Sequence, residues 1–101
     1  MNKRKNRTWE EFEIEELTKN PKRIKTYLSV ALEEYQKDGD EKAFLYALSI
    51  ATKVQGGFSK ISKKTGLNRE NLYRALSKNG DPRLSTFMIV LHTLGYRLQL
   101  V

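Results

Sequence analysis

Several residue types are absent or rare in this chain of 101 residues. There is no cysteine, so disulfide bonds and thiol catalysis are excluded. The single histidine, His92, has no cysteine with which to share a zinc ion, and we expect no bound metal. No apolar run approaches the length of a membrane span, and none follows the basic N-terminus as a secretory signal requires. We therefore expect a cytoplasmic protein with no membrane partner.

The sequence also lacks the usual groupings of catalytic residues. It shows no nucleophile beside a base, no glycine-rich phosphate loop and no paired carboxylates suited to acid–base chemistry. His92 falls in the last turn of a predicted helix, and we assign it no ligand or catalytic role. An enzyme, including an RNA-processing one, is disfavoured, and we expect no cofactor.

Negative charge is scarce in the second part of the chain. Residues 1–40 carry nine basic and nine acidic side chains, whereas residues 41–101 carry ten basic and three acidic ones, so the net charge of +7 resides in the latter. These basic side chains are interleaved with a regular apolar pattern, which places them on a folded surface. A localised positive field attracts polyanions, of which nucleic acid is the commonest in cells.

The length and the apolar spacing predict one all-α domain of five to six helices with a short C-terminal strand. We divide the chain into a basic flexible arm over 1–7, an N-terminal helical extension over 8–39, a helix-turn-helix DNA-binding core over 40–95 and a short strand over 96–101. The arm is either a disordered terminus or a segment that reaches into a DNA minor groove.

Capping residues and glycines predict the bounds of the helices. We expect helices over about 21–38 with Asn20 as N-cap, 41–55 with Asp40, 59–65 with Ser59, 69–77 with Asn68, and 84–94.

The two ends of the patterned region are harder to interpret. Thr8 and Glu11 have capping-box spacing for a helix, whereas Phe12 and Ile14 alternate with glutamates as in a strand. Residues 96–100 alternate between apolar and polar side chains, which is typical of a strand. Such a strand needs a partner, either residues 12–14 or a second copy of the chain.

Residues 58–76 have the anatomy of a helix-turn-helix. Gly66 ends the first helix in a conformation that glycine adopts most easily, and Asn68 caps the second. Ser62 is small where the helices cross. Four apolar residues are expected to pack the two helices together: Ile61, Leu67, Leu72 and Leu76.

The second helix of this pair is expected to present polar side chains to DNA. Arginine pairs with guanine, asparagine with adenine, and glutamate accepts from cytosine. The predicted base contacts are therefore Arg69, Glu70, Asn71 and Arg74. Side chains suited to phosphates without specifying sequence are the predicted backbone contacts. These are Ser59, Lys60, Lys63, Lys64, Asn68, Tyr73 and Lys78.

Five glutamates are concentrated near the N-terminus, at positions 10, 11, 13, 15 and 16. They are either a solvated face around Trp9, Phe12, Ile14 and Leu17, which we favour, or a surface that covers a basic RNA-cleaving partner.

Residues 31–101 resemble the addiction-module antidote family, antitoxins with a Cro/repressor-type helix-turn-helix. The resemblance rests on three stretches: residues 31–34 with Asp40 and 44–48, residues 65–77, and Gly80-Asp81-Pro82 through residues 90–98. It implies a homodimeric repressor that binds operator DNA. It also implies direct binding and neutralisation of a cognate toxin, commonly an RNA-cleaving protein of the RelE-like kind, encoded in the same operon.

One departure from the family pattern affects the site. Repressors of this type often have Thr-Gln where Ser59-Lys60 stands here, and a lysine cannot accept a hydrogen bond from a base. A phosphate contact by Lys60 is therefore favoured. The alternatives that stay open are a stand-alone phage-type repressor without a toxin and a protein-interaction adaptor.

Overall fold

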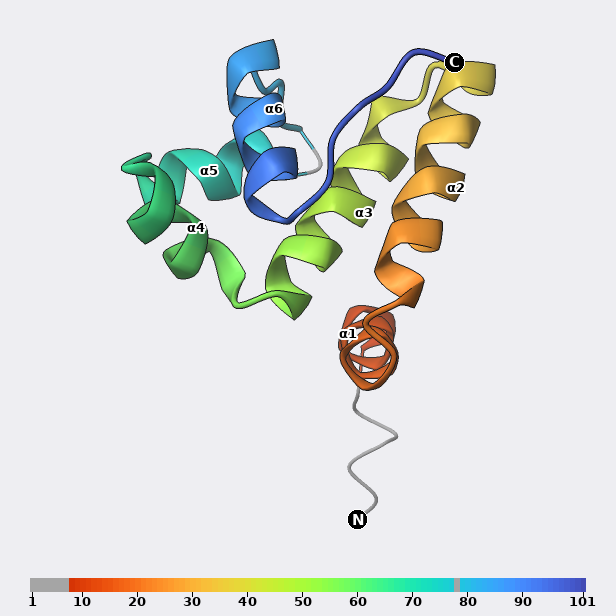
Figure 1. Ribbon diagram of the computed structural model, residues 1–101, viewed down its shortest axis with the longest axis horizontal. Helices are drawn as coiled ribbons and strands as arrows, with labels where there is room; N and C mark the ends of the chain where they lie inside the picture. The colour runs from red at the N-terminus through yellow and green to blue at the C-terminus, as the bar shows by residue number, and fades with distance from the viewer. Residues whose placement is uncertain (1–7, 78) are drawn as a thin grey trace.

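A computed structural model describes residues 8–77 and 79–101, and those residues form six α-helices and no strand. The helices are α1 (Trp9–Lys19), α2 (Arg23–Asp38), α3 (Glu41–Val54), α4 (Gly57–Thr65), α5 (Arg69–Ala75) and α6 (Leu84–Thr93). The all-α class and the upper helix number are confirmed. Figure 1 shows α3 at the centre, with α2 on one side and α4, α5 and α6 on the other.

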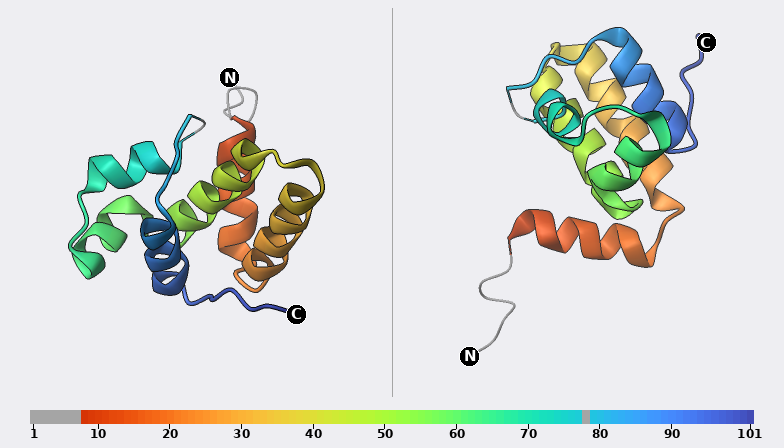
Figure 2. Two further views of the ribbon diagram at one scale, coloured as in Figure 1. Left: turned by 90° about the horizontal axis from the view of Figure 1, so that it is seen from above. Right: turned by 90° about the vertical axis from the view of Figure 1, so that its left-hand side faces the viewer.

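The first helix settles the ambiguity at the start of the described chain. The Thr8 hydroxyl accepts a hydrogen bond from the Glu11 N–H at 3.0 Å, and the Glu11 carboxylate accepts one from the Thr8 N–H at 3.1 Å. This reciprocal capping box starts a helix, because it satisfies two N–H groups that a helix otherwise leaves unpaired. Figure 2 shows α1 crossing beneath the other helices.

Two of the predicted helix boundaries between α1 and α3 are confirmed and one is wrong. Gly39 ends α2 at a φ of 72°, and the Asp40 carboxylate accepts from the Lys42 N–H at 3.0 Å. Asn20 does not cap α2, which begins at Arg23 without a side-chain cap. Asn20 instead ends α1, where its amide donates to the Glu16 carbonyl at 3.3 Å.

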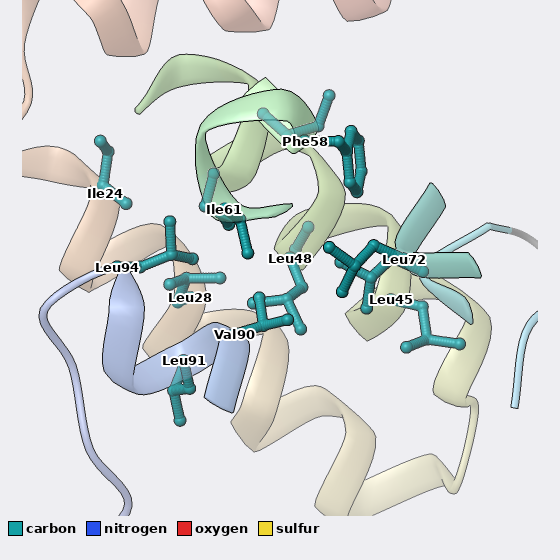
Figure 3. Packing of buried hydrophobic residues seen from close by; sticks show 14 of the residues in the cluster. Ile24, Leu28, Leu45, Leu48, Phe58, Ile61, Leu72, Val90, Leu91 and Leu94 are labelled. Atoms are coloured by element: carbon teal, nitrogen blue, oxygen red, sulfur yellow. The ribbon is translucent and has the colours of Figure 1, made fainter. Parts of the chain in front are cut away.

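The core is built around α3. Leu48, Ile50 and Ala51 have no exposed surface, and α3 packs against α1, α2 and α4. Residues from α2, α4, α5 and α6 converge on it, as Figure 3 shows for Ile24, Leu28, Ile61, Leu72, Val90 and Leu91. The buried Thr52 hydroxyl donates to the Leu48 carbonyl at 2.9 Å, so the helix itself satisfies this polar group. Seven residues of α3 are buried, from Phe44 to Thr52, as expected for a helix that is packed on several sides.

The predicted strand at the C-terminus is wrong for the described chain. Residues 96–101 have no regular structure and run back past α3 and α2 (Figure 1). The Tyr96 N–H donates to the Leu91 carbonyl at 3.0 Å, and the Gln55 amide donates to the Tyr96 hydroxyl at 3.4 Å. One of the two partners expected for it, residues 12–14, lies inside α1, so no extended backbone is available there for pairing.

Candidate nucleic-acid interface

Two short helices, α4 and α5, are joined by the three-residue turn 66–68. Gly66 has a φ of 78°, and its N–H donates to the Ser62 carbonyl at 2.8 Å, which ends α4 as predicted. The Asn68 side chain accepts from the Asn71 N–H at 3.0 Å and starts α5, which confirms that N-cap.

Two hydroxyl groups of α4 hold this turn in place. The Ser62 hydroxyl donates to the Leu67 carbonyl at 2.6 Å, and the Thr65 hydroxyl accepts from the Leu67 N–H at 3.2 Å. The sequence interpretation treated Ser62 only as a small residue at a helix crossing and missed its hydrogen bond. The signal was a hydroxyl residue one turn before a helix-ending glycine, a position from which it reaches the backbone of the turn.

The apolar contacts predicted between the two helices are present. Ile61, Leu72 and Leu76 are buried in the common core, and Leu67 packs against it. Phe58, also buried, meets the Tyr73 ring edge-on with centroids 5.5 Å apart. These contacts fix the orientation of α5 relative to α4.

Two predicted boundaries of this helix pair are wrong. The first helix begins at Gly57, after Gly56 at a φ of 110°, so Ser59 lies inside α4 and is not its N-cap. Gly56 adopts a left-handed backbone conformation that other residues rarely take, so the chain turns at this residue between α3 and α4. The second helix ends at Ala75 instead of Ser77, whose hydroxyl donates to the Arg74 carbonyl at 2.7 Å.

All four predicted base contacts are exposed on α5. Glu70 and Arg74 lie on the side of the helix opposite the buried Leu72. The Arg74 guanidinium donates to the Asn71 side-chain oxygen at 2.9 Å. That bond links two of the predicted reading residues one turn apart and limits the rotamers of the long arginine.

The predicted backbone contacts flank this surface. Ser59, Lys60, Lys63 and Lys64 are exposed on α4, and Tyr73 is exposed on α5. Asn68 is exposed at the turn, while Lys78 lies outside the described residues. Among the described residues, no carboxylate forms an ion pair with a cation of α4 or α5. Their positive charge therefore remains available to an external anion.

Two glutamates of the acidic segment in α1, Glu10 and Glu13, bind side chains of other helices. The Tyr46 hydroxyl donates to Glu13 at 2.6 Å, the Tyr27 hydroxyl donates to Glu13 at 3.3 Å, and Lys53 forms an ion pair with Glu10 at 2.7 Å. Burial, followed by the nearby Glu13 carboxylate, raises the pKa of both tyrosines well above the usual value.

These contacts correct the picture of a uniformly solvated acidic face, because Glu10 and Glu13 join α1 to α2 and α3. Sequence reasoning missed the roles of both tyrosines, whose partners lie 14 and 33 residues away along the chain. Trp9, by contrast, is exposed and stacks on Phe12 with centroids 5.3 Å apart.

Neither a membrane-spanning helix nor a metal site is found within residues 8–77 and 79–101. None of the helices there is both long and apolar enough to cross a membrane. No group of three or more His, Asp or Glu side chains there is arranged to hold a metal ion.

Comparison with known proteins gives one family. A family model described as "Probable addiction module antidote protein" matches residues 8–101. A curated protein from Haemophilus influenzae, described as uncharacterized, is 30% identical over 89 residues, which cover 88% of this chain and 87% of the relative. No solved structure gives a significant match. Because the family model spans nearly the whole chain, this protein belongs to the family of probable addiction module antidote proteins.

Proposed function

We propose that this protein is the antitoxin of a type II toxin–antitoxin module and that it binds operator DNA through α5 as a dimeric repressor. The observation that carries DNA binding is the exposed α5 surface, with Arg69, Glu70, Asn71 and Arg74 beside cations that have no ion-pair partner among the described residues. The antidote role is supported by the family description.

The arrangement of α4 and α5 divides the work of binding between them. Side chains of α5 have the donor and acceptor groups that distinguish base pairs in the major groove. The lysines of α4 are flexible point charges, which bind phosphates and hold the protein in register along the duplex. Lys63 and Lys64 lie in the last turn of α4, so they directly precede the turn that positions α5.

The hydrogen bond from Arg74 to Asn71 gives this surface a preferred starting geometry. A guanidinium that is already oriented loses less conformational entropy when it meets a guanine. The bond uses one of the two lone pairs of the Asn71 oxygen in the free protein. The second lone pair and the Asn71 amide group are still available for an adenine, so Arg74 and Asn71 can read bases without breaking this bond.

The antidote role requires a partner besides DNA. We infer that the partner is a cognate RNA-cleaving toxin, which the protein neutralises by direct binding while it represses their shared operon. Co-expression of this chain with the protein encoded beside its gene tests this part of the function. Rescue of growth together with a stable complex in gel filtration supports it, and growth arrest that this chain does not relieve contradicts it.

An electrophoretic mobility shift titration tests DNA binding. The probes are a duplex from the promoter region of the gene and a scrambled duplex of equal length. We expect tighter binding to the promoter duplex and an affinity that falls steeply with salt. Equal affinity for both duplexes contradicts the repressor function, and salt-independent binding contradicts a phosphate-based interface.

A further inference from the structure

The last helix, α6, is apolar around most of its circumference. Residues 84–94 include no Asp, Glu, Lys or Arg. Val90, Leu91 and Leu94 on the inner side are buried in the core. A helix that is hydrophobic on all sides is typically buried on all sides, yet one side of α6 is covered by no other part of the described chain.

The uncovered side forms a continuous stripe. Leu84, Met88 and Ile89 are 73%, 38% and 39% exposed. Ser85 and His92 are also exposed and continue the same helical spacing, so the five residues share one face. We refer to Leu84, Ser85, Met88, Ile89 and His92 as the α6 outer face.

An apolar groove of about 360 Å³ adjoins this face at the start of α6. Phe87 forms one wall and packs edge-on against Phe44, which in turn stacks on Tyr35. Leu84 lines the groove on the α6 side, and Leu98 of the C-terminal tail lines it as well. The groove extends the apolar surface from α6 toward α2 and α3.

We propose that the α6 outer face and this groove bind a second copy of the same chain. Two copies that each carry a net charge of +7 repel one another, so they are best joined through a region without full charges. The α6 outer face carries no lysine, arginine or carboxylate. In a two-fold dimer the same patch meets itself, and the leucine, methionine and isoleucine of one copy then pack against the apolar side chains of the other.

Other occupants fit this face less well. Nucleic acid needs cations, which the face lacks. A toxin that cleaves RNA must hold a polyanionic substrate, and a cationic protein surface of that kind is complemented by carboxylates. The α6 outer face has none, and Glu41 is the one carboxylate among the residues that line the groove.

The proposal rests in part on the proposed function, because operator binding gives the dimer its use. Since α6 packs directly on α4, a contact between two copies of α6 holds the two α4–α5 units at a fixed separation. Two-fold operators require half-sites about 34 to 36 Å apart.

Sedimentation velocity of the double variant Leu84→Asp/Met88→Asp tests the interface. We expect a wild-type dimer and a monomeric variant with unchanged helical circular dichroism, because opposed carboxylates repel in an apolar contact. The matched control is Val30→Asp on α2, which alters a side chain that is 52% exposed and is expected to leave the dimer intact. A monomeric wild type, or a double variant that stays dimeric, overturns the proposal.

Cysteine cross-linking gives a second test that does not depend on a disruptive substitution. The chain has no native cysteine, so Ser85→Cys introduces a single thiol on the α6 outer face, in the first turn of the helix and next to Leu84, which lines the groove. We expect rapid disulfide-linked dimers under mild oxidation, and none for the control Thr26→Cys on α2. Equal cross-linking of both variants overturns the proposal. A dimer that cross-links at Ser85→Cys but fails to bind the promoter duplex preserves the interface and rejects the repressor function.

Discussion

The contact between α1 and α3 and the surface of α4 and α5 use charge in opposite ways. Lys53 of α3 is paired with Glu10 of α1, and Glu13 of α1 accepts from Tyr27 of α2 and Tyr46 of α3. On α4 and α5, the cations have no carboxylate partner among the described residues. Charges that are satisfied within the chain serve its structure, whereas those left unpaired on a rigid surface are available to a polyanion.

Loss of an α5 arginine is the change expected to weaken DNA binding most. Arg69→Ala and Arg74→Ala should each cost about 1 to 3 kcal/mol at the promoter site and leave binding to a scrambled duplex nearly unchanged. Mobility shift titrations on both duplexes measure the two affinities. Equal losses on both would mean that these arginines contact phosphates only, and the distinction between α5 and α4 would fail.

A change in α1 is expected to lower the stability of the fold and to leave DNA binding unchanged. Glu13→Gln removes the charged acceptor shared by Tyr27 and Tyr46, and we expect a loss of about 1 to 2 kcal/mol in the free energy of unfolding with unchanged DNA affinity. Urea denaturation measures the stability, and Glu33→Gln on α2 is the matched control. An unaltered stability would show that the hydrogen bonds to Glu13 are too exposed to contribute. Weaker DNA binding would show that the contacts of α1 also affect the surface of α4 and α5.

Smaller effects are expected from the lysines of α4. Replacing Lys60, Lys63 or Lys64 by Ala should weaken binding to all sequences alike. For each phosphate that a variant no longer neutralises, the slope of log affinity against log salt should fall by about one unit. Lys37→Ala, on the last turn of α2, is the control. If all three variants keep the wild-type slope, DNA meets the protein through another face.

Local signals predicted those parts of the fold that depend on neighbouring residues. The turn at Gly66 and the caps Asp40 and Asn68 involve hydrogen bonds between residues close together in the chain and were predicted correctly. The C-terminal strand was wrong, because alternation alone does not supply a partner strand. Glu13, Tyr27 and Tyr46 meet only after α1 folds onto α2 and α3, so their contacts leave no local pattern in the sequence. The four predicted reading residues are all exposed on α5, and their contacts with DNA stay a prediction.

The smallest expected effect concerns alkaline pH. Burial and the neighbouring Glu13 raise the pKa of Tyr27 and Tyr46 in the folded protein above the ordinary value of about 10. Their contribution to stability is complete below pH 10, where the folded and unfolded chains both hold the phenolic protons.

Above pH 10 the unfolded chain releases these protons while the folded chain keeps them, so stability falls until the folded-state pKa is passed. Tyr46→Phe should therefore make the decline of stability above pH 10 shallower than in the wild type. Tyr73→Phe, which removes a hydroxyl on α5, should leave the decline unchanged. Thermal unfolding between pH 8 and about pH 11 checks this, and parallel declines in all three proteins would show that the bond between Tyr46 and Glu13 does not persist in solution.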